Sequence, residues 1–277
     1  TQDWFFCPLG LNPSQTNFFP DSISKISDIL GDPFSNISAS AAAIFAGSAF
    51  AASSQFRMTL ENGNRCFHSN GLPDHTTGQF PNRGNPHAIA EQRVRLCVPS
   101  EPQIAAKATP IKGTMGIAVN GVQFRPNTAE LWDASSPRNH SRRGDKRWSV
   151  DIHGAPGKLG LDFNNAHVGN GGLYHYHGIA TSLTKTSGSS LVGYAGDGHE
   201  IHFVPGVQSG WTLKSGPRPN GPGGTYDGTY NEDYEYKGEP GQLDQCNGGI
   251  YGGSYTYFVT ETYPFLPRCL VGKVSPD

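Results

Sequence analysis

Residues 167–177 read HVGNGGLYHYH, and this stretch predicts a β-hairpin. The run GNGG at 169–172 is composed of residues that favour tight turns between strands. Side chains two residues apart in a strand point to the same face, so His175 and His177 share one face and the intervening tyrosines face the other way. A turn centred near Gly171 places His167 opposite His175, where cross-strand Cβ atoms lie about 5 Å apart. The hairpin is therefore expected to gather three imidazoles on one face.

Three imidazoles with an open coordination position form a site for one transition metal ion, with zinc or copper as the first expectation. Zinc in such a site lowers the pKa of bound water to about 7, which favours hydrolytic chemistry. His167, His175 and His177 are therefore the predicted metal ligands. The alternative left open is a polar strand whose partly exposed histidines pair with the neighbouring tyrosines.

Two aspartates near these histidines are the predicted catalytic residues. Asp162 lies shortly before His167, where it would either accept an imidazole N–H or cap a turn. Asp197 precedes Gly198 in a turn dipeptide, where it would either serve the turn alone or act as a fourth ligand or a general base. His199 and His202, three residues apart in the next strand, face opposite sides, so at most one of them can join the same site.

The chain from Gln55 onward has the pattern of a mainly β protein. Strand-like segments of five to eight residues alternate with Asn-Gly, Asp-Gly and Pro turn signals, and the chain holds 36 Gly and 21 Pro. The clearest hairpins join 56–60 to 65–68 and 115–119 to 122–125, and 255–260 is a further strand. The expected fold is a sandwich or barrel-like domain, rich in hairpins and long ordered loops, over residues 57–277.

Residues 1–56 differ in pattern from this β domain. The segment 21–30 places three isoleucines at helical spacing, and 39–52 is a nearly continuous apolar run. We expect a short helical N-terminal extension over 1–56. The apolar segment is interpreted as a helix packed on a sheet, with a partner-binding or pro-segment role left open.

Composition excludes several classes of protein. The net charge of −2 disfavours a nucleic-acid-binding surface over the whole molecule, and the absence of a run of 18 apolar residues predicts no membrane span. Five separate cysteines without a CxxC pair are better explained by disulfides in a secreted protein, extracellular or periplasmic, than by a structural zinc site. Cys66 with Cys97 and Cys246 with Cys269 are the sequence-local pairings, although four cysteines allow three connectivities and Cys7 is left over.

Two charged segments add further hypotheses. Residues 225–245 hold six acids and one lysine, so they either bind calcium or form a solvated loop packed on tyrosines. Residues 138–147 hold four arginines and a lysine, which either form a solvated loop or bind an anionic substrate, small or polymeric, if the histidines lie nearby.

The run Tyr174-His175-Tyr176-His177-Gly178 resembles the signature of the YHYH-domain family, secreted proteins found largely in bacteria. Other segments that resemble this family, together spanning about residues 57–271, are 70–75, 78–86, 164–168, 193–198, 221–228, 243–248 and 264–269. The resemblance implies that the histidine motif binds metal, and it includes His167, His175, His177, Asp162 and Asp197 among the family positions. It implies no settled activity. Residues 1–56 lie outside it, the basic stretch at 138–147 is not a shared feature, and His199 and His202 depart from the family's apolar or aromatic positions.

The sequence as a whole predicts a secreted metalloprotein, with a metal-dependent hydrolase acting on an ester or phosphoester as the first hypothesis. A non-catalytic extracellular protein that binds copper or zinc is the main alternative. A copper redox enzyme and a calcium-stabilised carbohydrate-binding module are weaker alternatives.

Overall fold

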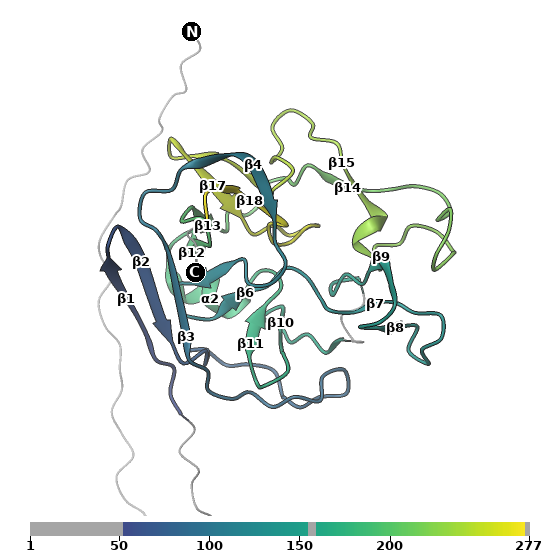
Figure 1. Cartoon of the computed structure of the whole chain (residues 1–277), viewed down its shortest axis with the longest axis horizontal. Coiled ribbons are helices and arrows are strands. Elements are labelled where there is room, and N and C mark those ends of the chain that lie inside the picture. The colour runs from purple at the N-terminus through teal and green to yellow at the C-terminus, as the bar shows by residue number, and fades with distance from the viewer. Residues whose placement is uncertain (1–51, 155–158, 275–277) are drawn as a thin grey trace, which may run out of the picture. The chain divides into compact units, whose positions relative to one another are not determined.

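A computed structural model of the chain describes residues 52–154 and 159–274, which fold mainly as β-strands in several sheets (Figure 1). This confirms the predicted fold class. None of the sheets in the described part closes into a barrel. The helical extension expected over 1–56 falls almost entirely on residues 1–51, outside the described residues.

The largest sheet has eight strands in the order β10-β11-β6-β5-β12-β13-β17-β16. Its strands, in chain order, are β5 (Gly116–Ala118), β6 (Gln123–Phe124), β10 (Ala166–Val168), β11 (Tyr174–Tyr176), β12 (Leu191–Ala195), β13 (Glu200–His202), β16 (Gly248–Tyr251) and β17 (Ser254–Phe258). The hairpin β10–β11 forms one edge of this sheet, and β11 continues into it through a parallel pairing with β6. The histidine motif is therefore carried by the edge of the main sheet.

The other strands form smaller sheets around it. They are β1 (Phe56–Glu61), β2 (Asn64–Ser69) and β3 (Val94–Pro99) in one sheet, β4 (Ile104–Pro110) with β18 (Cys269–Gly272), β7 (Leu131–Trp132) with β8 (His140–Ser141) and β9 (Asp145–Ser149), and β14 (Trp211–Leu213) with β15 (Tyr234–Tyr236). Two short helices complete the described part, α2 (Thr181–Ser187) and the 3-10 helix η1 (Asn231–Asp233). The hairpins predicted at 56–68 and 115–125 correspond to β1–β2 and β5–β6.

The main hydrophobic core lies against the large sheet and explains the tyrosines of the motif. Tyr174 and Tyr176 are fully buried and pack with Phe124, Val192 and other apolar side chains. Because side chains alternate along β11, burying both tyrosines turns the histidines to the opposite face. The aromatic half of the YHYH motif thus anchors the strand in the core.

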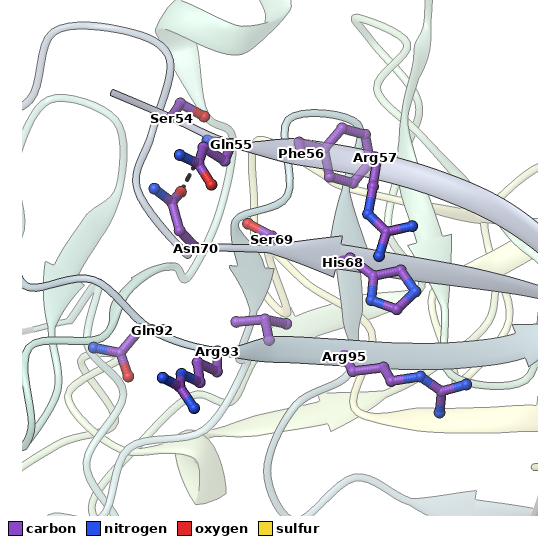
Figure 2. Close-up of a pocket in the computed structure, with 11 residues that line it drawn as sticks. Ser54, Gln55, Phe56, Arg57, His68, Ser69, Asn70, Gln92, Arg93 and Arg95 are labelled. Carbon is purple, nitrogen blue, oxygen red and sulfur yellow. Dashed lines mark hydrogen bonds between the residues drawn. The ribbon is translucent and has the colours of Figure 1, made fainter. Parts of the chain in front are cut away.

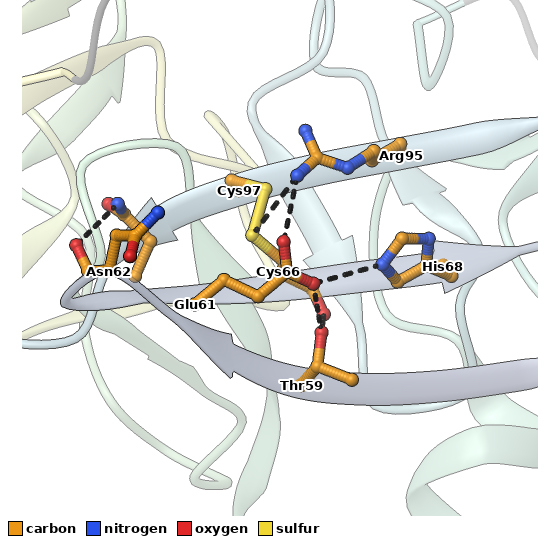
Figure 3. Close-up of a disulfide and its surroundings, with 8 residues drawn as sticks. Thr59, Glu61, Asn62, Cys66, His68, Arg95 and Cys97 are labelled. Atoms are coloured by element: carbon orange, nitrogen blue, oxygen red, sulfur yellow. Dashed lines mark hydrogen bonds and ion pairs between the residues drawn. A yellow bond between two sulfur atoms is a disulfide. The ribbon is translucent and has the colours of Figure 1, made fainter.

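Both sequence-local disulfides are formed. Cys66 and Cys97 lie directly opposite each other on β2 and β3 (Figure 3), and Cys246 is bonded to Cys269 at the start of β18. Cys7 lies outside the described residues. No helix in the described residues has both the length and the apolar character needed to cross a membrane.

The acidic stretch 225–245 is organised around an arginine. The Arg218 side chain is almost fully buried and donates hydrogen bonds to both carboxylate oxygens of Asp233 and to Asp227. Asp244 accepts the hydroxyl hydrogen of Tyr255 and two backbone N–H groups. These three carboxylates are therefore neutralised or hydrogen-bonded by the protein itself, which disfavours a calcium site at them, and the buried Asp233 departs from the solvated loop expected as the alternative.

Candidate metal centre

The β10–β11 hairpin has the register that the sequence predicts. His167 pairs directly with His175, and His177 follows the end of β11. The centroids of the three imidazole rings lie 4.7 to 4.8 Å apart. One nitrogen of each ring lies within 4.8 Å of the others, and the Nε2 atoms of His167 and His177 are 3.2 Å apart. The turn at 169–172 therefore brings three imidazole nitrogens to one point.

Two backbone carbonyls fix which ring nitrogen carries the hydrogen in His167 and His175. His167 Nδ1 lies 2.9 Å from the Leu159 carbonyl oxygen, and His175 Nδ1 lies 3.0 Å from that of Leu173. A carbonyl oxygen only accepts, so each Nδ1 carries the hydrogen and donates it, which leaves a lone pair on each Nε2. Second hydrogen bonds of this kind orient metal-binding histidines and set their tautomer.

His177 is the most deeply placed of the three. Its side chain is almost fully buried, and its Nδ1 is a buried nitrogen with no hydrogen-bond partner among the described residues. Its backbone carbonyl lies 3.0 Å from His153 Nε2, and the His153 ring stacks on Phe265 with centroids 3.8 Å apart. His153 thus supports the backbone behind the cluster.

Burial keeps the three imidazoles uncharged. Desolvation is the main cause that lowers the pKa of His175, to about 3, and the neighbouring His167 lowers it further. The pKa values of His167 and His177 are also lowered, in both cases chiefly by burial. Neutral imidazole is the form that binds metal, so at neutral pH these residues need not lose a proton first. The donor set fits a transition ion such as zinc or copper.

The cluster opens onto a cavity of about 530 Å³, which we call the histidine cavity. His167 and His175 form part of its wall. Other parts of the wall come from distant segments and include Arg125, which directly follows β6, and Glu130, Arg138 and Arg142 around the β7–β8 sheet. A small ligand can therefore reach the imidazoles from a space that also holds charged side chains.

Asp162 lies beside the hairpin but does not contact an imidazole. Its Oδ1 accepts the backbone N–H groups of Asn164 and Ala166, and its Oδ2 accepts Gly78 N–H and the Tyr174 hydroxyl. These bonds close the turn before β10 and tie the buried tyrosine to it. Of the two roles predicted for Asp162, the contacts support the turn cap.

Asp197 lies in the turn between β12 and β13. In the main sheet, β6 and β5 separate these strands from the histidine strand β11. Its fully buried carboxylate accepts the Tyr257 hydroxyl at 2.6 Å and Gly272 N–H at 2.8 Å. It does not line the histidine cavity and does not belong to the three-histidine group. The structure therefore does not bring Asp197 together with the histidines.

The other histidines considered from sequence are held elsewhere. His199 Nδ1 lies 3.0 Å from the Tyr255 carbonyl oxygen, and His202 Nε2 lies 2.7 Å from Glu200 Oε2. Neither belongs to a group of potential metal ligands among the described residues.

Sequence reasoning missed two residues of the histidine cavity, Glu130 and Arg125. Glu130 Oε2 lies 2.7 Å from His140 Nδ1, and its side chain remains 16% exposed. Neither residue belongs to a motif or a charge cluster in the sequence, so no local signal indicates it. Two arginines of the basic segment, Arg138 and Arg142, line the same cavity as His167 and His175, which is the proximity that the anionic-substrate hypothesis requires.

A second group of potential ligands lies on β1–β3. Glu61, Cys66 and Cys97 come within 4.8 Å of one another, but the two sulfur atoms are joined in the disulfide (Figure 3). A disulfide sulfur has no thiolate charge to offer a metal. Among the described residues, the histidines are therefore the group with free donor atoms.

The fold and the site together define a disulfide-linked, mainly β protein with a three-histidine candidate metal centre at a sheet edge. Residues 95–272 match the family described as YHYH protein, and since this is more than half of the chain, the chain belongs to that family. The match begins at Arg95, after the first segments that resemble the family in sequence. No curated protein and no solved structure matches the chain.

Proposed function

We propose that this protein binds one transition metal ion, zinc or copper, through the Nε2 atoms of His167 and His175 and a ring nitrogen of His177, and uses it to hydrolyse an ester or phosphoester. The observation that carries the proposal is the convergence of three neutral imidazoles, two of which, His167 and His175, form part of the wall of a cavity of about 530 Å³. The two disulfides fit an oxidising compartment, so we place the protein outside the cytoplasm, extracellular or periplasmic.

A metal ion of this kind, when bound, supplies a Lewis acid that polarises a carbonyl or phosphoryl oxygen and activates water. The residues of the chain prepare the site for it. The carbonyls of Leu159 and Leu173 hold two rings with their Nε2 lone pairs available, and burial keeps the rings neutral. Tyr174 and Tyr176 fix the strand from behind by packing in the core.

Glu130 is the carboxylate best placed to accept a proton from water in the histidine cavity. Its other interactions hold it at the wall: His140 contacts Oε2, and Arg142 Nε lies 4.0 Å from Oε1. Asp162 serves as a positioning residue of the hairpin. The contacts of Asp197 give no support for the general-base role expected from sequence.

The test is the elemental content of untagged full-length protein purified without chelator. We expect about one equivalent of zinc or copper, lost in the His175→Ala/His177→Ala variant and kept in His68→Ala, which changes a half-buried histidine of another sheet. The same preparations are assayed with p-nitrophenyl acetate and p-nitrophenyl phosphate. Wild-type protein that takes up no transition metal after incubation with each ion would overturn the proposal.

A non-catalytic copper- or zinc-binding protein is the second candidate, favoured by the deep burial of His177. Cobalt(II)-substituted protein separates the two. A visible spectrum that shifts when cyanide is added indicates an open coordination position and supports the hydrolase, whereas an unchanged spectrum supports a closed, non-catalytic site.

A further inference from the structure

The wall of the histidine cavity carries an excess of positive charge. Three arginines line it: Arg125 after β6, and Arg138 and Arg142 on either side of β8. The carboxylate that lines the same cavity is Glu130. Three guanidinium groups against one carboxylate give this wall a formal charge of about +2, counted with neutral histidines.

The side chains of these three arginines have almost no partners among the described residues. Arg142 has only the distant Glu130 contact at 4.0 Å, and that carboxylate is already engaged by His140. For Arg125 and Arg138, the described residues provide no side-chain hydrogen bond or ion pair. By contrast, three arginines outside the cavity each form a close pair with a carboxylate: Arg147 with Asp145, Arg218 with Asp233 and Arg268 with Asp151.

Arg125 is the most informative of the three. It is half-buried, and its backbone N–H donates to the Tyr176 carbonyl oxygen, which fixes it beside the histidine strand. A partly desolvated guanidinium without a partner is costly, since its five N–H donors need acceptors. A ligand oxyanion in the cavity would supply them.

We propose that Arg125, Arg138 and Arg142 form an oxyanion-binding subsite next to the three histidines, and that the substrate is a phosphate monoester. The assignment of a substrate rests on the proposed hydrolase function; the anion subsite itself does not. A dianionic phosphoryl group matches the +2 wall better than a singly charged carboxylate does. Guanidinium groups bind phosphate oxygens through pairs of parallel hydrogen bonds, which also orient the group.

The test is calorimetric titration of full-length protein with inorganic phosphate, on wild type and on the His175→Ala/His177→Ala variant. The second background removes the imidazole ligands, so phosphate binding there reports the arginines. We expect Arg142→Ala and Arg138→Ala each to weaken binding about tenfold in both backgrounds, as for loss of a charge-assisted hydrogen bond. Arg143→Ala, the same charge change on the neighbouring exposed residue, should alter affinity less than about twofold.

Both altered arginines are exposed, so their replacement leaves the fold intact, which circular dichroism verifies. Equal phosphate affinity in Arg142→Ala, Arg138→Ala and Arg143→Ala would overturn the subsite even if the protein holds metal. Arginine-dependent phosphate binding in a protein that takes up no metal would keep the subsite and reject the hydrolase. Acetate binding as tight as phosphate would overturn the choice of a dianionic group.

Discussion

The histidine cavity and a groove on the three-stranded sheet are both lined by arginines and histidine, yet they differ in how their polar groups are satisfied. The groove, of about 620 Å³, is bordered by Arg57, His68 and Arg95, which form a row across β1, β2 and β3 (Figure 2). Glu61 on the same sheet contacts both Arg95, at 3.0 Å, and His68, at 3.5 Å. Glu61 therefore supplies countercharge to His68 and Arg95, whereas Arg57 and Arg93, which also line the groove, have no ion pair among the described residues.

In the histidine cavity the polar groups are left for a ligand. Its imidazoles are neutral, the Nε2 atoms of His167 and His175 carry lone pairs, and Arg125 and Arg138 lack carboxylate partners among the described residues. The sheet that carries the groove also carries the second group of potential metal ligands, Glu61, Cys66 and Cys97, which is closed by a disulfide. Proximity of ligating residue types is thus not sufficient for a site. Free donor atoms distinguish the three histidines from the group on β1–β3, and the half-buried Arg125, unpaired within the described part of the chain, distinguishes the cavity from the groove, whose arginines are all exposed.

The largest effect that we expect is a loss of folding stability at acidic pH, caused by the buried histidines of the cavity. The folded-state pKa of His175 is lowered to about 3, while the unfolded chain titrates near 6.5, so the unfolded state binds more protons between these values. In chelator-treated protein, the contribution of neutral His175 to the free energy of unfolding is then fully present above pH 6.5. It falls by about 1.4 kcal/mol per pH unit as the pH is lowered toward 3. Urea unfolding at pH 4 to 7 measures it. An unchanged slope in His175→Gln would contradict the burial argument.

A carboxylate outside both regions should matter for folding only. Asp197→Ala leaves the buried Tyr257 hydroxyl and Gly272 N–H without their acceptor, which we expect to cost about 4 kcal/mol. Metal content and hydrolysis per folded molecule should remain unchanged. Chemical denaturation and metal analysis of the same preparation check both. Loss of metal from a folded Asp197→Ala variant would instead restore the role expected from sequence.

Removing the disulfide of the three-stranded sheet should lower the stability of the protein without changing its metal binding. Cys66 and Cys97 close a loop with a sequence separation of 31, so Cys66→Ser/Cys97→Ser should lower stability by about 3 to 4 kcal/mol on a loop-entropy estimate. The metal content of the folded protein should stay at one equivalent. If the variant folds but loses its metal, the ligands of the site extend beyond the three histidines.

The smallest effect is expected for Arg57, one of the exposed arginines of the groove. Arg57→Ala changes the same charge as Arg142→Ala, but it lies outside the histidine cavity. Stability should change by less than about 0.5 kcal/mol, and phosphate affinity should match that of wild type. Calorimetry on the two variants side by side makes the comparison. An equal loss of phosphate affinity in both variants would mean that phosphate binding depends on the net charge of the protein rather than on a defined subsite.

Much of the candidate site was predictable because its signals are local. The turn at 169–172 and the two-residue period of a strand place His167, His175 and His177 together, and the structure has that register. The hairpins at Asn62-Gly63 and Asn120-Gly121 follow from the same turn chemistry. The aspartates were harder, because Asp162 and Asp197 sit in turns where the same residue type either caps the backbone or performs chemistry.

The sequence by itself determined the mainly β fold, the histidine hairpin and the YHYH signature of the family, since each depends on residues close together in the chain. Only the tertiary structure decided what surrounds the histidines. Glu130 and Arg125 reach the histidine cavity through the packing of separate sheets, and Asp197 is held elsewhere by Tyr257 and Gly272. The physical reason is that turn and strand preferences act over a few residues, whereas the charge and partners of a cavity depend on segments that only folding brings together.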